Sequence, residues 1–241
     1  MLVSVIMPLY NKSKYVEEAI NSILCQTYKK FELIIIDDCS NDDSVRKVKE
    51  FNDKRIKLIE LDKNMGVSYA TNVGIKNSQG DYIIRMDADD ISRHDRIEKQ
   101  VNFAIEENIE LVGSQFNIFS DNDIPIGLYR FMNYSNKIIE YREIIDNFTV
   151  MMPVSQSTFC IKREIFEEGF YYDTSLSTAE DYELLGRMLI RGIKVKKIPE
   201  KLFYYRYIRT SLSNGKRIET IINSLRIKLN FIYEYYKLKE K

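Results

Sequence analysis

Residues 31–38 read Phe-Glu-Leu-Ile-Ile-Ile-Asp-Asp, an apolar run that stops at two carboxylates. Every position of Leu33–Ile36 is apolar, which is typical of a strand buried on both faces of a parallel sheet. Tyr82–Ile84 repeats this pattern, and the predicted strand Tyr82–Met86 to which it belongs ends at the acidic segment Asp87–Asp90. The two stretches predict a sheet covered by helices on both sides, with acidic side chains at the carboxyl ends of its strands.

Helical and extended patterns alternate on both sides of this stretch, which predicts a mainly parallel sheet with right-handed crossovers. The predicted strands of the first half are Val3–Leu9, Phe31–Ile36, Ile56–Leu61 and Tyr82–Met86. The predicted helices are Tyr15–Cys25, Ser44–Phe51, Val67–Ile75 and Asp95–Ile105.

The second half is less regular. Leu111–Phe119 and Ile124–Phe131 flank the turn-forming segment Asp121–Asp123, which predicts an antiparallel hairpin. Further strands are predicted at Thr158–Ile161, Ile193–Ile198 and Phe203–Ile208, and further helices at Ala179–Ile190 and Gly215–Lys237. No internal repeat or low-complexity linker interrupts residues 1–241, so we expect a single domain.

Composition argues against several classes of protein. The chain has 241 residues, of which 44% are hydrophobic, enough for one core without disulfides. Lys+Arg and Asp+Glu both number 36, and this balance argues against broad binding to nucleic acid. Three widely spaced cysteines without a CxxC pair, and one histidine, His94, argue against a zinc site.

The N-terminus and the hydropathy pattern predict a cytoplasmic protein. The first residues lack the basic region of a signal peptide, and no apolar run approaches the ~20 residues that span a bilayer. The final predicted helix, Gly215–Lys237, has a broad apolar face and several lysines and arginines. We expect that face to pack on the domain or on a second copy in a homodimer. Peripheral contact with the inner face of the cytoplasmic membrane is the alternative.

Polar side chains follow three of the predicted strands. Tyr10 and Asn11 follow the first strand, Asp38 the second, and Asp87 and Asp89 the fourth. Because ligands of open α/β sheets lie beyond the carboxyl ends of the strands, we expect these acids to share a crevice that requires a cation. Carboxylate oxygens favour magnesium or manganese. Asp87 and Asp89 have the same parity, so one suits the metal and the other a ribose hydroxyl.

The order of these motifs resembles family 2 glycosyltransferases of the GT-A fold. The resembling blocks are Val3–Asn11, Ser22–Tyr28, Phe31–Ser40, Asn64–Gly66, Ala70–Gly74, Gly80–Tyr82, Asp87–Asp90, Glu180–Leu184, Tyr205–Arg206 and Ser211–Ser213. They cover about residues 2–213, in order and with the expected gaps. The resemblance implies an α/β fold that is GT-A-like (Rossmann-like), with a mixed, mainly parallel sheet, flanking helices and a C-terminal helix.

The resemblance also implies a role for individual side chains. Pro8, Tyr10 and Asp38 would line the nucleoside pocket, Asp87 would contact the ribose, Asp89 would hold the metal, and Asp181 would be the catalytic base. Arg85 shares the parity of Asp87 and either supports the diphosphate or forms an ion pair with the acids. Asp38 and Asp181 also suit a structural role, since acids near a helix start act as caps or favour the helix dipole.

The activity implied by the resemblance is inverting transfer of a sugar from a nucleotide-diphosphate donor, such as a UDP-sugar, to an acceptor hydroxyl. The cofactor would be manganese or magnesium, and the acceptor a saccharide or glycolipid of surface polysaccharide or glycolipid synthesis. About residues 1–90 would bind the nucleotide, about residues 91–213 the acceptor, and residues 214–241 would form the C-terminal helix.

Departures from the family pattern leave alternatives open. Thr71 stands where members often have Arg, Gln156 where many have His, and His94 where many have Pro. A catalytically weak or inactive relative that binds only nucleotide or a partner is therefore an alternative. A sugar nucleotidyltransferase would need a glycine-rich basic loop after the first strand, and Tyr10–Lys14 contains no glycine. Neither GxGxxG nor GxxxxGK[ST] is present, which disfavours a dehydrogenase or a P-loop enzyme.

Overall fold

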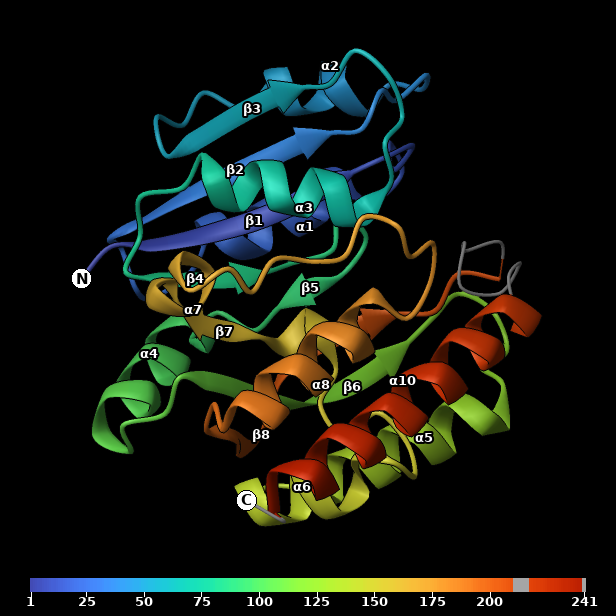
Figure 1. Cartoon of the computed structure of the whole chain (residues 1–241). Helices are drawn as coiled ribbons and strands as arrows, with labels where there is room; N and C mark the ends of the chain where they lie inside the picture. Colours follow the sequence, from blue (N-terminus) through green and yellow to red (C-terminus); the bar gives the residue numbers. More distant parts are fainter. Residues whose placement is uncertain (210–216, 240–241) are drawn as a thin grey trace.

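The computed structural model describes residues 1–209 and 217–239 and shows an eight-stranded sheet with helices on both faces (Figure 1). The sheet order is β3-β2-β1-β4-β7-β6-β8-β5. The strands are β1 Val3–Leu9, β2 Phe31–Asp37, β3 Ile56–Glu60, β4 Tyr82–Arg85, β5 Ile91–Ser92, β6 Leu111–Phe119, β7 Cys160–Lys162 and β8 Val195–Arg206. The predicted fold class, a mixed and mainly parallel sheet flanked by helices, is confirmed.

Helices cover the two faces of the sheet in two layers. They are α1 Val16–Leu24, α2 Ser44–Lys49, α3 Val67–Lys76, α4 Arg96–Glu106, α5 Ile126–Lys137, α6 Tyr141–Phe148, η1 Gln156–Thr158, α7 Arg163–Glu167, α8 Glu180–Arg191 and α10 Arg217–Lys239. One apolar core lies under α1, α2, α4 and α5, and the other under α3, α6, α7, α8 and α10. Alternate residues of β2 enter the two cores, which explains why its sequence is continuously apolar.

β1, β2, β3 and β4 run parallel, so their carboxyl ends lie at one edge of the sheet. The register places Leu9 of β1 opposite Asp37 of β2. β7 runs antiparallel to β4 and to β6, and β6 then pairs in parallel with β8. This order brings β8, which is late in the chain, to the same sheet as the first strand.

The prediction of an antiparallel hairpin from Leu111–Phe119 and Ile124–Phe131 is wrong. Its first strand is β6, but the segment predicted as the second strand lies mostly in helix α5. Leu128, Phe131 and Met132 pack on the core at helical spacing, and the helix begins directly after Pro125. The short apolar run is therefore part of an amphipathic helix. The turn-forming segment before it favoured a hairpin and led to the wrong prediction.

The two predicted strands at Ile193–Ile198 and Phe203–Ile208 are one strand, β8. The pairing of β8 with β6 shifts register after Ser114, so that Pro199 and Glu200 have no partner in the ladder. Proline lacks an N–H to donate, and an irregularity of this kind accommodates it. The predicted block Ser211–Ser213 lies outside the described residues.

Helix α10 packs on the domain with a different face from the one expected. Ile227, Phe231 and Tyr235 face the second core, where the Phe231 and Phe148 ring centroids are 4.3 Å apart. The opposite side is exposed, and we call it the outer face of α10; it consists of Ile218, Ile221, Ile222, Leu225, Leu229, Ile232, Tyr233 and Tyr236. The prediction that this face packs on the domain is therefore wrong. Residues 215 and 216 of the predicted helix lie outside the described residues.

Within residues 1–209 and 217–239, no helix combines the length and the apolar content needed to cross a membrane.

Candidate active site

The loops after β1 and β2 are linked by hydrogen bonds at the carboxyl edge of the sheet. The Asn11 N–H donates to Ser40 Oγ at 3.0 Å, and Asn11 Oδ1 accepts the Asn41 N–H at 2.9 Å. The Lys12 N–H donates to Ser44 Oγ at 2.8 Å. Asn11 has a φ of 51°, a left-handed conformation that asparagine tolerates better than most residues. The backbone beside Tyr10 is therefore held in one conformation, with the Tyr10 side chain exposed.

Asp38 is buried and joins the second loop to the start of α3. Its two carboxylate oxygens accept the N–H groups of Met65 at 2.7 Å and Gly66 at 2.8 Å. It thus does not cap α2, the helix that follows it in sequence. A carboxylate has about four lone-pair sites, so these two bonds leave capacity for a further donor.

Arg85 and Asp87 form an ion pair at the end of β4. The Arg85 side chain is 4% exposed, and its Nη1 contacts Asp87 Oδ1. Ser157 Oγ donates to the other Asp87 oxygen at 2.7 Å. Two roles were predicted for Arg85, support of the diphosphate and an ion pair with the acids. The structure contains the ion pair. Burial by itself would raise the pKa of Asp87, but the charge of Arg85, the hydrogen bonds from Arg85 and Ser157 and the charge of Lys12 together lower it.

Asp89 pairs with a lysine from the first loop. Lys12 Nζ lies 2.5 Å from Asp89 Oδ2, and the two side chains are 27% and 15% exposed. Burial raises the pKa of Asp89, and the nearby charge of Asp87 adds to this against the opposing charge of Lys12. Lys12 is part of the site, and the motif analysis did not identify it.

Asp90 contacts Arg206, the last residue of β8. The Arg206 N–H donates to Asp90 Oδ1 at 2.6 Å, and Arg206 Nε donates to the Asp89 carbonyl at 2.8 Å. Arg206 also pairs with Glu18 and lies over the ring of Phe119 at 4.3 Å. The other Asp90 oxygen is buried without a hydrogen-bond partner. Burial, followed by the charge of Asp89, raises the pKa of Asp90.

The fully buried Arg96 contacts residues on both sides of the acidic segment Asp87–Asp90. Arg96 of α4 donates to the Arg85 carbonyl at 3.2 Å, to Ser92 Oγ at 3.1 Å and to Gln100 Oε1 at 2.8 Å. Gln100 in turn donates to the Thr158 carbonyl at 2.7 Å. The backbone before and after the acidic segment is therefore fixed by one buried network.

Asp181 and Glu180 form the first turn of α8. Ala179 before them has a φ of 61°, an unfavourable value for a residue with a Cβ, and such strain is often found at functional sites. Burial, followed by the charge of Glu180, raises the pKa of Asp181 to about 7. The positive charge of Arg85 opposes this rise, so Asp181 lies within electrostatic range of the Arg85–Asp87 pair.

The short helix η1 connects the two acidic groups. Gln156 Nε2 donates to Glu180 Oε1 at 3.3 Å, while the next residue, Ser157, donates to Asp87. Gln156 is the residue that stands where many family members have His. In this chain its amide acts as a hydrogen-bond donor to the carboxylate next to Asp181.

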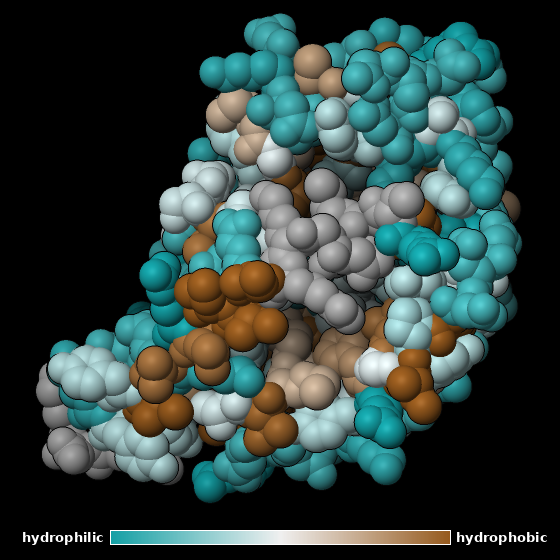
Figure 2. All heavy atoms as spheres, turned by 90° about the vertical axis from the view of Figure 1, so that its right-hand side faces the viewer, coloured by the Kyte–Doolittle hydropathy of each residue, from teal (hydrophilic) through white to brown (hydrophobic). Residues whose placement is uncertain are grey.

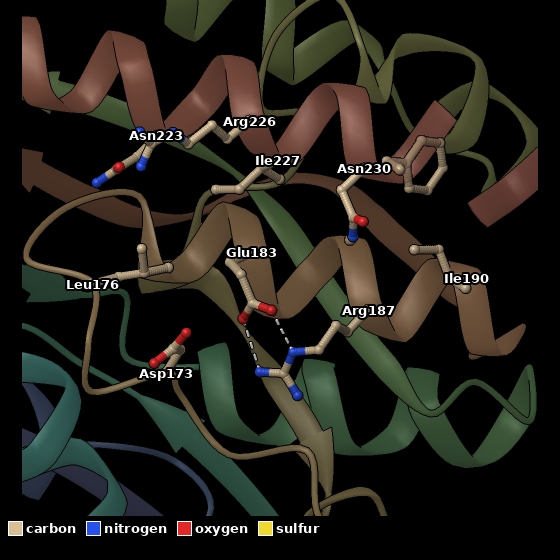
Figure 3. Close-up of a pocket in the computed structure, with 11 residues that line it drawn as sticks. Asp173, Leu176, Glu183, Arg187, Ile190, Asn223, Arg226, Ile227 and Asn230 are labelled. Atoms are coloured by element: carbon tan, nitrogen blue, oxygen red, sulfur yellow. Dashed lines mark hydrogen bonds and ion pairs between the residues drawn. The ribbon is translucent and has the colours of Figure 1, made fainter. Parts of the chain in front are cut away.

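A cavity of about 220 Å³ lies elsewhere, between α8 and α10 (Figure 3). Asn223 and Asn230 of α10 face Glu183 and Arg187 of α8 across it, and these two α8 residues form an ion pair. None of Asp87, Asp89 and Asp181 lines this cavity. We therefore place the candidate active site at the carboxyl edge of the sheet and not in this cavity.

The donor set at Asp89 fits a magnesium or manganese ion. Within the described ranges, no three His, Cys, Asp or Glu side chains gather as a metal site, so a cation here would have fewer than three such ligands from the protein. Magnesium is commonly bound by one or two carboxylates together with substrate phosphates, so a single protein ligand suffices. Asp89 uses one oxygen for Lys12 and has a second oxygen available.

The sheet order and the helix layers are those of the GT-A glycosyltransferases. S. aureus TarS 1-349 in complex with UDP superposes with a TM-score of 0.74 at 20% identity, over 96% of this chain and 65% of that chain. A mannosyltransferase from Pyrobaculum calidifontis, PcManGT in complex with GDP-Man and Mn2+, superposes with a TM-score of 0.70 at 18% identity, over 97% of this chain and 69% of that chain. This chain thus spans slightly less than two thirds of the TarS fragment. At these identities the likeness shows the fold.

The chain belongs to glycosyl transferase family 2, whose sequence profile matches residues 4–170. It is also similar to the putative teichuronic acid biosynthesis glycosyltransferase TuaG of Bacillus subtilis (strain 168). The two sequences are 28% identical over 217 residues, which cover 89% of this chain and 82% of TuaG. The family resemblance inferred from the motifs is thereby confirmed. Asp181 lies beyond the matched residues.

The sequence predicted which acids lie in the candidate site better than it predicted the side chains beside them. Arg85, Asp87 and Asp89 lie together as their parity suggested, and Asp181 lies within electrostatic range of Arg85. Four residues beside these acids were not predicted as site residues: Lys12, Ser157, Glu180 and Arg206. Glu180 and Arg206 stand in the resembling blocks Glu180–Leu184 and Tyr205–Arg206, whereas Lys12 and Ser157 had no such signal.

Proposed function

We propose that this chain is an inverting glycosyltransferase that moves a sugar from a UDP-sugar to an acceptor hydroxyl and depends on magnesium or manganese. UDP in the TarS complex, and GDP-Man with Mn2+ in the PcManGT complex, support a nucleotide-sugar donor and a divalent cation in this fold. The name of TuaG supports an acceptor in surface polysaccharide or glycolipid synthesis.

One observation supports this proposal most strongly. Asp181, with a pKa near 7, lies within electrostatic range of the Arg85–Asp87 pair. A carboxylate with a pKa near the working pH is suited to act as a general base, because it is deprotonated and still basic enough to take a proton. The acidic segment would bind the donor, and Asp181 would serve the acceptor.

The donor would lie against the loops after β1, β2 and β4. In this proposal Pro8, Tyr10 and Asp38 line the nucleoside pocket, and Asp87 accepts hydrogen bonds from the ribose hydroxyls. The Asp87 carboxylate is fixed by Arg85 and Ser157, so its orientation is set before the donor binds. Arg85 would act on the diphosphate through its positive charge.

Asp89 would hold the divalent cation. When bound, the cation would neutralise the negative charge that develops on the leaving diphosphate. Lys12 now neutralises Asp89, so the ammonium and the cation would compete for the same carboxylate. Arg206 holds the Asp89 carbonyl and would keep this part of the backbone in place during that exchange.

Asp181 would take the proton of the acceptor hydroxyl. The acceptor oxygen forms a bond to the anomeric carbon while the bond from that carbon to the diphosphate oxygen breaks. The bonding electron pair leaves with the diphosphate, and the proton moves to an Asp181 oxygen. A single displacement of this kind inverts the anomeric centre, and one base suffices for it.

Calorimetry of UDP binding tests the role of Asp89. We expect UDP to bind about tenfold or more tightly with manganese than with EDTA, and Asp89→Ala to remove this difference. Asp181→Ala should keep it, because Asp181 acts on the acceptor. Equal UDP affinity in both buffers for the wild-type protein would overturn the metal role. Loss of UDP binding in a folded Asp181→Ala variant would overturn the division of roles.

A further inference from the structure

Helix α10 has two apolar sides, and only one of them is covered. Phe231 on the inner side is 4% exposed and packs against α6 and α8. On the outer face, Leu225 is 53% exposed, Leu229 67% and Tyr233 63%. Figure 2 shows hydrophobic side chains, in brown, gathered on the lower left of one face of the molecule. A contiguous group of exposed apolar side chains marks an interaction site.

The borders of the outer face carry basic side chains. With 3.6 residues per turn, Arg226 and Lys237 lie along one border of the face and Lys228 along the other. α10 contains five basic and two acidic residues, whereas the whole chain is neutral. Glu219 is engaged by a hydrogen bond from Ser177 of the domain, and Glu234 lies toward the inner side. α10 therefore carries more positive than negative charge beside the outer face.

We propose that the outer face of α10 docks on the anionic surface of a lipid bilayer. Apolar side chains would enter the boundary between headgroups and acyl chains, and the basic borders would meet lipid phosphates. Tyr233 and Tyr236 suit that depth, because tyrosine has an apolar ring and a polar hydroxyl. A second copy fits less well, since the basic borders of two such faces would lie close together in a self-pair.

The inner side of α10 links the docking surface to the first turn of α8. Asn223 Nδ2 donates to the Thr178 carbonyl at 3.3 Å and to Thr178 Oγ1 at 3.2 Å. Thr178 lies three residues before Asp181 in the chain. A bilayer bound to the outer face would therefore lie one helix diameter from the turn that carries Asp181.

Co-sedimentation with vesicles tests this proposal on the full chain. We expect binding to phosphatidylcholine vesicles that contain about 30% phosphatidylglycerol, and much weaker binding to phosphatidylcholine alone. The double variant Leu225→Asp, Leu229→Asp should lower binding about tenfold or more, because two side chains lose their place among acyl chains. Arg226→Gln and Lys237→Gln should each lower binding about fivefold at low salt.

Ile105→Asp is the matched control, because Ile105 is a 47% exposed apolar residue on α4. It should bind vesicles like the wild type, and circular dichroism should show that all variants are folded. Wild-type protein that does not sediment with anionic vesicles would overturn the proposal, and so would binding that survives the double variant. A dimer in light scattering that the double variant dissociates would identify a second copy as the occupant instead. Vesicle binding is measured without sugar transfer, so this result is independent of the proposed activity.

Discussion

Two neighbouring carboxylates at the start of α8 have different surroundings. Glu180 is 8% exposed and accepts a hydrogen bond from Gln156, whereas Asp181 is only partly buried and accepts the N–H of Tyr182. Burial and the negative charge of Glu180 both disfavour the ionised form of Asp181 and raise its pKa to about 7. Glu180 therefore adjusts the basicity of the proposed base through space.

We predict that Glu180→Gln shifts the acid limb of the pH–rate profile to lower pH. Removing the neighbouring charge lowers the pKa of Asp181, so a larger fraction of Asp181 is deprotonated at about pH 6. The profile of kcat/KM against pH measures this. Glu183→Gln, one turn further along α8, is the control and should leave the limb in place. An unmoved limb in Glu180→Gln would contradict the assignment of that limb to Asp181.

The grouping of Asp87 and Asp89 could be predicted from the sequence because it follows a local rule. Asp87 and Asp89 end a buried strand, and their parity places them on one side of it. Their cations could not be predicted in this way. Lys12 and Arg206 lie 77 and 117 residues from Asp89 in sequence, and only the sheet brings them to it.

Elements with one clear period were predicted well, and elements with mixed signals were not. β1, β2 and β4 are mainly apolar segments, and each was located to within a residue. The segment before α5 has turn residues and a short apolar run, which fit a strand and a helix equally. For α10, apolar residues occupy both sides of the helix, so the pattern alone could not identify the packed side.

The packing of α10 predicts unequal effects for two nearby substitutions. Phe231→Ala should lower the free energy of unfolding by about 3 to 5 kcal/mol, because the ring fills the space beside Phe148 and Tyr235. Leu229→Ala should change it by less than about 0.5 kcal/mol, since Leu229 is 67% exposed. Urea unfolding of both variants measures the difference.

The close approach of α8 and α10 supports this expectation. A Cβ added to Gly186 of α8 would lie 2.9 Å from the Phe148 ring of α6 and 3.8 Å from Ile227 of α10, so the absence of a side chain lets Phe148, the partner of Phe231, lie against α8. Equal losses of stability in Phe231→Ala and Leu229→Ala would show that α10 does not pack through its inner side.

At the scale of the whole molecule, the site forms where two parts of the sheet meet. β2 and β4 lead to the acids of the proposed donor side, β1 leads to Tyr10 and Lys12, and β7 joins these strands to the β6–β8 pair. The end of β8 then returns Arg206 to the acidic segment, and η1 and α8 bring Gln156, Ser157 and Asp181. The strand order of the second half carried no local signal, and for this reason the arrangement of these residues could not be predicted.

The proposed mechanism makes Asp181 necessary for turnover and unnecessary for donor binding or stability. Its raised pKa means that the ionised form is disfavoured in the folded protein. The contribution of this group to stability is therefore present below its ordinary pKa near 4 and is lost as the pH rises through about 7. At about pH 8 a neutral asparagine should thus leave the protein at least as stable as the wild type.

The most direct test is the turnover of Asp181→Asn at saturating donor, measured with the donor affinity and with the anomeric configuration of the wild-type product by NMR. We predict a loss in kcat of ~10²–10⁴-fold, donor affinity within about threefold of the wild type, and inversion of the donor configuration. Glu183→Gln should retain wild-type turnover. Retention of configuration, or an Asp181→Asn enzyme that turns over as fast as the wild type, would contradict the mechanism.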